Sequence, residues 1–243
     1  MKILLNNSDL NEALYNVSNL GFVPTMGSLH QGHISLIKKS LKECKKTIVS
    51  IFVNPTQFNK KNDFKNYPRN IKKDLSILRR LKVNFLYMPK VNDVYSFGRK
   101  SFTKLKKKDQ IMCAKFRKGH FEGVINVMDR LTNIIKPQKI FMGEKDFQQL
   151  LLIKRHIPKK YKAKIVSCKT IRDKNRLAFS SRNTLLSNTE LKKAKAISKE
   201  MFFFKKKLYK NKNIKKLLSK KRSELINLFN IKLDYLELRN IFS

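Results

Sequence analysis

The first 170 residues contain short apolar runs that alternate with longer stretches of helical periodicity. The run at 47–53 is β-branched and almost entirely apolar, which is typical of a strand buried on both faces of a parallel sheet. Further strands are expected at the start of the chain and at 21–23, 83–88, 139–142 and 163–168. Helices are expected at 9–17, 34–44, 71–81, 123–135 and 146–156. Strands that alternate with helices predict right-handed βαβ units and a mostly parallel sheet.

After about residue 170 the chain becomes lysine-rich and mainly helical. Helices are expected at 190–207 and 214–229, and the alternation of apolar and polar residues over 233–238 predicts a short final strand. We therefore expect two domains. Residues 1–170 are predicted to form a Rossmann-like, doubly wound α/β domain, and residues 171–243 a smaller α+β domain. The stretches 56–68 and 90–120 are expected to be irregular.

The charge of the chain adds a second possible function. With 56 Lys and Arg against 17 Asp and Glu, the net charge is +39, which by itself favours a nucleic-acid-binding protein. The excess is mostly lysine and accompanies abundant Asn, Ile, Leu and Phe, whereas a nucleic-acid site concentrates basic and aromatic residues. We therefore favour a chain-wide compositional drift that attracts anions in general, and keep nucleic-acid binding as the alternative.

The lengths of the apolar runs and the spacing of the cysteines indicate the cellular compartment and whether the chain enters a membrane. No apolar run approaches the roughly 20 residues that cross a bilayer, and the N-terminus does not resemble a signal peptide. Cys44, Cys113 and Cys168 are far apart and lack metal-binding spacing, which favours reduced thiols. We expect a cytoplasmic protein with no membrane partner.

The stretch 23–33, Val-Pro-Thr-Met-Gly-Ser-Leu-His-Gln-Gly-His, joins an expected strand to an expected helix. His30 and His33 would share one face of the first helical turn. That turn exposes unpaired backbone N–H groups and the positive end of the helix dipole, so it suits a phosphate-bearing ligand. The chain has neither a P-loop nor a Gly-x-Gly-x-x-Gly motif. Phosphate binding on such a turn is expected of nucleotidyl-transferring α/β folds.

Three further polar stretches follow expected strands, at 54–58, 143–149 and 171–183. In a doubly wound sheet, ligands bind at the carboxyl ends of the strands, near the point where the strand order reverses. We therefore expect these stretches and 23–33 to share one pocket.

Residue types within these stretches indicate their possible roles. Lys145 is a mobile cation that can reach a phosphate oxygen. The Ser-Ser-Arg run at 180–182 combines hydroxyl donors with a guanidinium, although it would serve equally well as a helix cap. Gln57 and Gln149 can each donate and accept hydrogen bonds, which suits a substrate with hydroxyl and carboxylate groups.

A metal site is less well defined than the phosphate site. Asp63, Asp74 and Asp146 could help to hold Mg²⁺, but their spacing matches no metal-binding pattern. The metal ligands therefore remain unassigned.

Several blocks of this chain together resemble the pantothenate synthetase (pantoate–β-alanine ligase) family. They occur in family order between about residues 20 and 185 and include the stretch 23–33. The other blocks are Ser-Ile-Phe-Val-Asn-Pro-Thr-Gln-Phe (50–58), Tyr-Pro-Arg (67–69), Gly-His-Phe-Glu-Gly-Val (119–124), Phe-Met-Gly-Glu-Lys-Asp-Phe-Gln-Gln-Leu (141–150) and Leu-Ala-Phe-Ser-Ser-Arg-Asn (177–183).

The resemblance implies a nucleotidyltransferase fold of the HIGH type and a ligase that uses ATP with Mg²⁺. In the implied reaction, pantoate attacks the α-phosphorus of ATP to give pantoyl adenylate and pyrophosphate. The amine of β-alanine then displaces AMP and gives pantothenate. The resemblance also implies a homodimer that acts on small molecules and binds no specific nucleic acid.

The resemblance assigns site residues by position. His33, His30 and Lys145 would be catalytic, with His33 the family's assigned proton donor. Pantoate and β-alanine would contact Gln57, and pantoate would contact Gln149. ATP would be bound by Met26, Gly27, Ser28, Leu29, His30, Gln31, Gly32, His33, Gly143, Glu144, Lys145, Asp146, Ile171, Phe179, Ser180, Ser181 and Arg182. We favour hydrogen-bond donation to a phosphate as the role of both histidines, because a carboxylate nucleophile has no proton to lose.

The chain departs from the family pattern in three places. Asn175-Arg176 replaces the usual Asp-Gly, Thr56 replaces the usual Met, and the chain ends soon after 238, where relatives continue for some tens of residues. We therefore expect an abbreviated C-terminal domain and a weaker lid. A nucleotidyltransferase acting on another acid or phosphate, and a decayed enzyme that keeps only the fold, remain alternatives.

Overall fold

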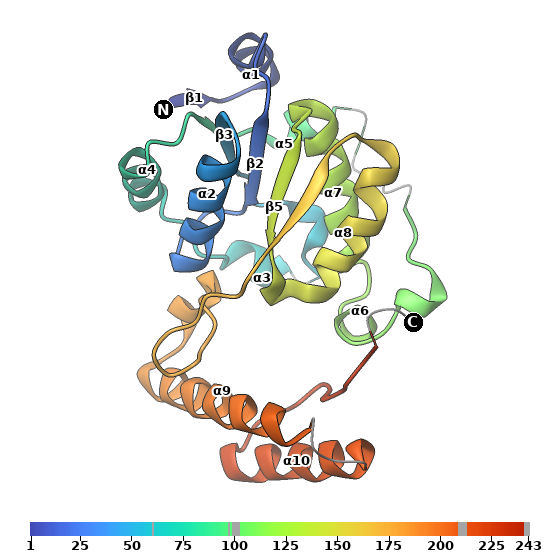
Figure 1. Cartoon of the computed structure of the whole chain (residues 1–243). Coiled ribbons are helices and arrows are strands. Elements are labelled where there is room, and N and C mark those ends of the chain that lie inside the picture. Colours follow the sequence, from blue (N-terminus) through green and yellow to red (C-terminus); the bar gives the residue numbers. More distant parts are fainter. Residues whose placement is uncertain (60, 97, 99–102, 209–212, 241–243) are drawn as a thin grey trace.

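The computed structural model describes residues 1–59, 61–96, 98, 103–208 and 213–240, and these residues form a parallel six-stranded sheet flanked by helices (Figure 1). The strands lie in the order β1-β4-β3-β2-β5-β6, and every pairing is parallel. The strands are β1 (Lys2–Leu4), β2 (Leu20–Thr25), β3 (Lys46–Ile51), β4 (Phe85–Tyr87), β5 (Lys139–Gly143) and β6 (Lys164–Cys168). The expected doubly wound parallel sheet is confirmed.

Helices connect the strands and continue beyond the sheet. The α-helices are α1 (Asn7–Leu14), α2 (Gln31–Glu43), α3 (Lys61–Lys65), α4 (Ile71–Arg80), α5 (Val91–Val94), α6 (Cys113–Phe116), α7 (His120–Ile135), α8 (Phe147–Lys160), α9 (Asn188–Leu208) and α10 (Ile214–Phe229). Short 3₁₀ turns are η1 (Pro55–Gln57), η2 (Lys107–Asp109), η3 (Glu144–Asp146) and η4 (Ser181–Leu185). Of the described helices, none has the length and apolar character needed to span a membrane.

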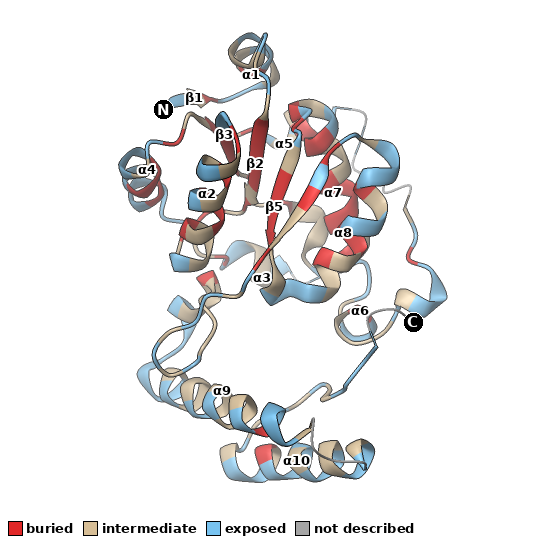
Figure 2. Cartoon of the chain, in the orientation of Figure 1, coloured by how far each residue is buried: buried red, intermediate tan, exposed pale blue. Residues whose placement is uncertain are grey.

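Alternate strand residues contribute to two hydrophobic clusters, one on each face of the sheet. Phe22 and Ile140 pack with α7 and α8, whereas Val23 and Phe141 pack with α2 and α4. All four side chains have no exposed surface, and the central strands are largely buried in Figure 2. Because helices cover both faces of the sheet, the strand sequences are continuously apolar and do not alternate between apolar and polar residues.

The strand order reverses between β2 and β5. From β2 the chain proceeds to β3 and then β4 on one side, and it later returns to the other side of β2 as β5 and β6. Such a reversal opens a crevice at the carboxyl ends of the two neighbouring strands. The stretches that follow β2 and β5 therefore face each other across this crevice.

Three one-turn helices were not predicted from the spacing of apolar residues. α3 lies in the expected loop 56–68, and α5 and α6 lie in the stretch 90–120. Segments of four or five residues are too short to show a 3.6-residue repeat. Residues 97 and 99–102 of that stretch lie outside the described part of the chain.

After residue 170 the described part of the chain is mainly helical, and its β structure is limited to an isolated antiparallel bridge between Arg172 and Ala178. Helices α9 and α10 contact each other at a distance from the sheet, with Phe204 and Leu225 buried between them (Figure 1). Residues 233–238 form no strand. Their alternating pattern is compatible with a strand, but the segment runs apart from every sheet edge, so its backbone has no partner strand.

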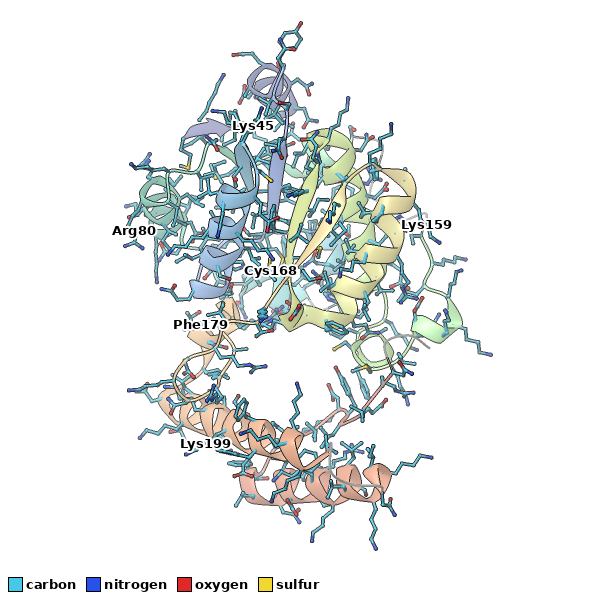
Figure 3. The ribbon with its side chains drawn as sticks, viewed as in Figure 1. Lys45, Arg80, Lys159, Cys168, Phe179 and Lys199 are labelled. Atoms are coloured by element: carbon cyan, nitrogen blue, oxygen red, sulfur yellow. The ribbon has the colours of Figure 1, made fainter. Side chains whose placement is uncertain are left out.

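Basic residues are distributed over separate elements. Figure 3 labels Lys45 after α2, Arg80 in α4, Lys159 in α8 and Lys199 in α9, and each is exposed. This distribution agrees with a compositional drift in charge.

Candidate active site

A cavity of about 240 Å³ lies at the carboxyl ends of β2, β3, β5 and β6. All four polar stretches line it, so the expected shared pocket is confirmed. The expected site residues that line it are Met26, His30, Gly32, His33, Gln57, Gly143, Lys145, Asp146, Gln149, Ile171, Phe179, Ser180, Ser181 and Arg182. The other expected residues do not line it: Gly27, Ser28, Leu29, Gln31 and Glu144.

Two histidines begin helix α2 and face the cavity. His30 is the N-cap residue, and its Nδ1 accepts the backbone N–H of Gly32 at 3.1 Å. The Nδ1 of His33 accepts the backbone N–H of His30 at 3.4 Å, and the two ring centroids lie 4.0 Å apart. Because each Nδ1 accepts a hydrogen bond, the neutral rings carry their protons on Nε2. Each histidine therefore has an N–H group left to donate to a ligand.

The protonation of this pair follows from its surroundings. Burial lowers the pKa of His30 to about 4, and the positive charge of Lys145 contributes. Burial lowers the pKa of His33 to about 3, with further contributions from His30 and Lys145. Both rings are therefore neutral at neutral pH. They can donate hydrogen bonds to a phosphate, but neither holds an extra proton to give away.

Asp74 of α4 clamps the loop that precedes the histidines. Its carboxylate accepts the backbone N–H groups of Ser28 at 2.8 Å and Leu29 at 2.7 Å. The loop turns at Gly27, whose φ of +80° favours glycine. Asp74 is only 1% exposed and both its oxygens are engaged, so the suggested Mg²⁺ role for this residue is wrong. The clamp directs the backbone N–H groups of Ser28 and Leu29 to α4.

The expected phosphate-binding cations are paired with carboxylates. Lys145 Nζ lies 2.9 Å from Asp146, and Arg182 Nη2 lies 2.9 Å from Asp63 of α3. These side chains are partly exposed, so a phosphate can compete with the carboxylates for them. The pairs hold the two cations at the cavity before a ligand arrives.

The two serines before Arg182 have separate tasks. Ser180 Oγ accepts the backbone N–H of Arg182 at 3.3 Å, so the helix-cap alternative is confirmed for Ser180. Ser181 Oγ donates to the backbone carbonyl of Ser28 at 3.1 Å. Ser181 thereby ties the loop after β6 to the loop after β2. Figure 3 shows Phe179 below Cys168, and the Phe179 ring lies 6.4 Å from that of His30.

A buried asparagine holds Gln57 in place. Asn54 Nδ2 donates to Gln57 Oε1 at 3.1 Å and to the backbone carbonyl of Gly123 at 3.2 Å. A Cβ atom at Gly123 would lie 2.9 Å from the Cα of Gln57 and closer still to the Thr56 carbonyl. Glycine is therefore required where α7 packs against η1. Asn54 was missed as a site residue, although it belongs to the 50–58 block.

His120, at the start of α7, is a third cavity histidine, and sequence reasoning assigned it no role. Its Nδ1 lies 2.7 Å from the backbone carbonyl of Gln57. A carbonyl can only accept, so Nδ1 carries the proton and Nε2 is left as an acceptor. Burial lowers the pKa of His120 to about 4, although the Gln57 hydrogen bond opposes this. His120 therefore presents a hydrogen-bond acceptor at Nε2, whereas His30 and His33 present donors there.

Arg117 also lines the cavity and was missed. Among the described residues, none makes a hydrogen bond or ion pair with its guanidinium. Burial and the nearby charge of Arg182 lower the pKa of Arg117, a shift that an incoming carboxylate would reverse. Arg117 lies in the stretch expected to be irregular, two residues before the 119–124 block. Its closeness to that block is the only sequence signal that could have identified it.

One end of the cavity is apolar. It is lined by Pro24, Phe52, Val124, Val127, Met128 and Leu131. Ser50 also lines the cavity, and its buried hydroxyl has no hydrogen-bond partner among the described residues. An apolar compartment that also exposes Gln57 and Gln149 suits a branched carbon skeleton with polar substituents.

The departures from the family pattern have structural consequences. The Thr56 hydroxyl donates to Asn54 Oδ1 at 3.1 Å and lies 3.0 Å from the hydroxyl of Tyr95. Arg176 has a φ of +69°, and its guanidinium lies 4.3 Å from the Phe202 ring in α9. Arg176 therefore connects the loop after β6 to the first helix beyond the sheet.

The described residues contain no group of three or more His, Cys, Asp or Glu side chains arranged to hold a metal. Asp146 lines the cavity, and Asp63 pairs with a cation that does. One or two carboxylates suit an Mg²⁺ ion that arrives with phosphates, because this ion keeps most of its ligands as water and phosphate oxygens.

Known proteins resemble this chain over most of its length. The family model for pantoate-beta-alanine ligase matches residues 2–242. A pantothenate synthetase of Helicobacter acinonychis is 41% identical over 99% of this chain and 88% of that protein. One of Endomicrobium trichonymphae is 44% identical over 83% of this chain and 73% of that protein.

Solved structures of the same kind superpose on this one. The pantoate-beta-alanine ligase from Francisella tularensis, complexed with beta-gamma ATP and beta-alanine, gives a TM-score of 0.86 at 37% identity. That alignment covers 99% of this chain and 90% of the other. Pantothenate synthetase from Thermus thermophilus gives a TM-score of 0.87 at 31% identity, over 94% of this chain and 83% of the other.

Proposed function

The chain belongs to the pantoate–β-alanine ligase family, and we propose that it condenses pantoate with β-alanine, using ATP, through a pantoyl-adenylate intermediate. It is a ligase of pantothenate biosynthesis. The observation that carries the proposal is the cavity itself. It combines a helix N-terminus with two neutral histidine donors, two cations, and an apolar compartment beside Gln57 and Gln149.

The first step forms the adenylate. A pantoate carboxylate oxygen attacks the α-phosphorus of ATP, and the bond from that phosphorus to the pyrophosphate oxygen breaks. His30 and His33 would donate their Nε2–H groups to phosphate oxygens, and Lys145 would offset the negative charge. Mg²⁺ carried by the phosphates would spread the charge of the leaving pyrophosphate, with Asp146 and Asp63 as the available carboxylates. Catalysis is then positioning and charge stabilisation, without an obligatory proton transfer.

The remaining ATP contacts follow from the cavity lining. Arg182 would exchange its partner Asp63 for a phosphate oxygen. The loop that carries Ile171 and Phe179 would border the nucleotide, because it lies against His30 through the Phe179 ring.

Pantoate would occupy the apolar end of the cavity. Its two methyl groups suit the surface formed by Val124, Val127 and Met128. Gln57 and Gln149 would hydrogen-bond its hydroxyl and carboxylate groups. Asn54 holds Gln57 Oε1, so the amide orientation of Gln57 is set before the substrate binds.

The second step joins the amine. The neutral amine of β-alanine attacks the acyl carbon, the bond to the adenylate oxygen breaks, and AMP leaves. Arg117 would pair with the β-alanine carboxylate, because its guanidinium lines the cavity without a partner among the described residues. His120 Nε2 would accept a hydrogen from the attacking amine, because its Nδ1–H already donates to Gln57.

Domain organisation and context complete the proposal. Residues 171–243 would act as a lid domain that closes over the nucleotide bound to residues 1–170. The free thiols of Cys44, Cys113 and Cys168 support a reducing, cytoplasmic location. A homodimer without nucleic-acid or membrane partners is the assembly that the family resemblance favours.

The test is AMP release by the purified full chain in the presence of ATP, Mg²⁺, pantoate and β-alanine. We expect release that requires both pantoate and β-alanine, together with pyrophosphate exchange into ATP that requires pantoate alone. AMP release that does not depend on pantoate would overturn the assignment. Gel-shift titration with RNA and DNA at low and moderate salt addresses the charge-based alternative.

A further inference from the structure

The segment that follows α10, residues 230–240, leaves the lid helices and runs back to the main domain at α6 (Figure 1). Helix α10 is capped by Asn230, whose φ of +44° is a left-handed conformation that commonly terminates a helix. Arg222 of α10 donates from Nη2 to the backbone carbonyl of Leu233 at 2.9 Å. The start of this C-terminal segment is therefore held against α10, and this contact sets the direction in which the chain leaves the helix.

Tyr235 makes the contact with the main domain. Its hydroxyl lies 2.7 Å from Sγ of Cys113, and its ring stacks on Phe116 with centroids 5.8 Å apart and an interplanar angle of 21°. Cys113 and Phe116 are the first and last residues of α6. One side chain from the C-terminal segment therefore contacts both ends of this one-turn helix.

Helix α6 leads directly to the two cavity residues proposed to handle the amine. The backbone N–H of Arg117 donates to the Cys113 carbonyl at 2.9 Å, and that of His120 donates to the Arg117 carbonyl at 3.1 Å. Within α6, Ala114 is the buried residue that anchors the turn to the core. A one-turn helix has little stability of its own, so contacts at its ends set its position.

We propose that Tyr235 is a positioning residue for the amine-joining step: by holding α6, it places Arg117 and His120 for β-alanine. The inference rests on the proposed function and adds to it a role for the C-terminal segment. It differs from lid closure over the nucleotide, because α6 leads to Arg117 and His120, which line the cavity and do not belong to the turn at 23–33. His30 and His33 are held by hydrogen bonds within α2, which do not involve Tyr235.

The test separates the two half-reactions in the full chain. Tyr235→Ala removes both contacts, and Tyr235→Phe removes the hydroxyl contact but keeps the ring. Tyr15→Ala is the matched control, because Tyr15 is 79% exposed in the main domain. Each variant is assayed for pantoate-dependent pyrophosphate exchange, for KM and kcat with β-alanine, and for hydroxamate formation with hydroxylamine. Hydroxylamine is an amine without a carboxylate, so it does not need Arg117.

We expect Tyr235→Ala to raise the KM for β-alanine about tenfold and Tyr235→Phe about threefold, in line with the loss of a stacked ring pair and a hydrogen bond. Exchange should stay within about twofold of the unmodified chain in both variants, because it precedes the amine-joining step. Hydroxamate formation should fall less than β-alanine-dependent turnover, because hydroxylamine uses His120 but has no carboxylate for Arg117 to bind. Tyr15→Ala should change none of the three.

Two results would overturn the proposal. The first is an equal loss of exchange and β-alanine-dependent turnover in Tyr235→Phe, since that is what a general loss of folding or lid closure produces. The second is an unchanged KM for β-alanine in Tyr235→Ala. Circular dichroism melts show whether Tyr235→Ala is folded at the assay temperature, and Tyr235→Phe carries the test if it is not. Absence of pantoate-dependent exchange in the unmodified chain would instead reject the proposed function.

Discussion

The carboxylate of Asp74 accepts the backbone N–H of Leu29 at 2.7 Å, across 45 residues of sequence. The same carboxylate also accepts the N–H of Ser28. This pairing fixes the loop that leads from β2 into the histidine turn, and it places His30 at the N-terminus of α2. The side of the cavity that carries His30 and His33 therefore depends on a residue of α4 that does not line the cavity.

Replacement of Asp74 by alanine should lower the free energy of unfolding by about 2–4 kcal/mol, because the buried N–H of Leu29 and the half-buried N–H of Ser28 lose their acceptor. Adenylate formation should fall as well, since the histidine turn loses its support. Urea denaturation and pantoate-dependent pyrophosphate exchange measure the two effects. Glu12→Ala is the control, because Glu12 makes only a surface ion pair with Lys2. A stability equal to that of the control variant would show that the clamp is unimportant.

Replacement of His33 by alanine should slow pantoate-dependent pyrophosphate exchange by about 10²–10³-fold, the usual cost of losing a donor to developing charge. His33→Gln should recover part of the rate, because its amide nitrogen can take the position of Nε2 and donate without titrating. His156→Ala, remote from the cavity on α8, should leave the rate unchanged. Equal rates for His33→Ala and His33→Gln would argue against a hydrogen-bond-donor role.

The three cavity histidines should make stability fall with acidification. Their pKa values in the fold are about 4 for His30, about 3 for His33 and about 4 for His120, each below the ordinary value of about 6.5. Below about pH 6.5 the unfolded chain therefore binds protons that the folded chain does not. The stabilising contribution is complete above that pH and is lost as the pH falls toward the folded values.

The slope of unfolding free energy against pH between about 6 and 4.5 measures this effect. It should approach about 1.4 kcal/mol per pH unit for each histidine, and each of His30→Gln, His33→Gln and His120→Gln should reduce it. A slope that no single substitution changes would place the titrating groups elsewhere. His156→Gln is the control for the fourth histidine of the chain.

Variants of Arg176 test how replacing the family's usual glycine with arginine affects stability. Its φ of +69° is unfavourable for arginine, while its stacking on Phe202 is favourable. Arg176→Gly relieves the strain and loses the stacking, so its stability should stay within about 1 kcal/mol of the unmodified chain. Arg176→Ala keeps the strain and loses the stacking, so it should be less stable than Arg176→Gly by about 1 kcal/mol. Thermal melts of the two variants give the order, and the reverse order would contradict this account.

Many helices and strands of the fold could be predicted from local pattern. The runs at 47–53 and 163–168 became β3 and β6, and the expected helix 214–229 has the bounds of α10. The meeting of four polar stretches at one cavity followed from the expected parallel sheet. These features depend on periodicity and on short-range residue types, which the sequence displays directly.

The alternation over 233–238 shows where local pattern is insufficient. A strand needs a partner strand, and in the fold this segment runs from α10 to α6 without one. Its aromatic residue Tyr235 contacts Cys113, 122 residues earlier, instead of a neighbouring strand. No residue near 233–238 in sequence indicates that contact.

The sequence by itself determined the order of strands and helices, the apolar core and the pair of histidines at a helix start. Only the tertiary structure decided that Asp74 is a clamp, that Arg117 lines the cavity, and that His120 presents an acceptor while His33 presents a donor. The physical reason is distance along the chain. Protonation state and tautomer depend on burial and on hydrogen bonds to residues tens of positions away, such as the bond from His120 to Gln57, and folding alone brings those partners together.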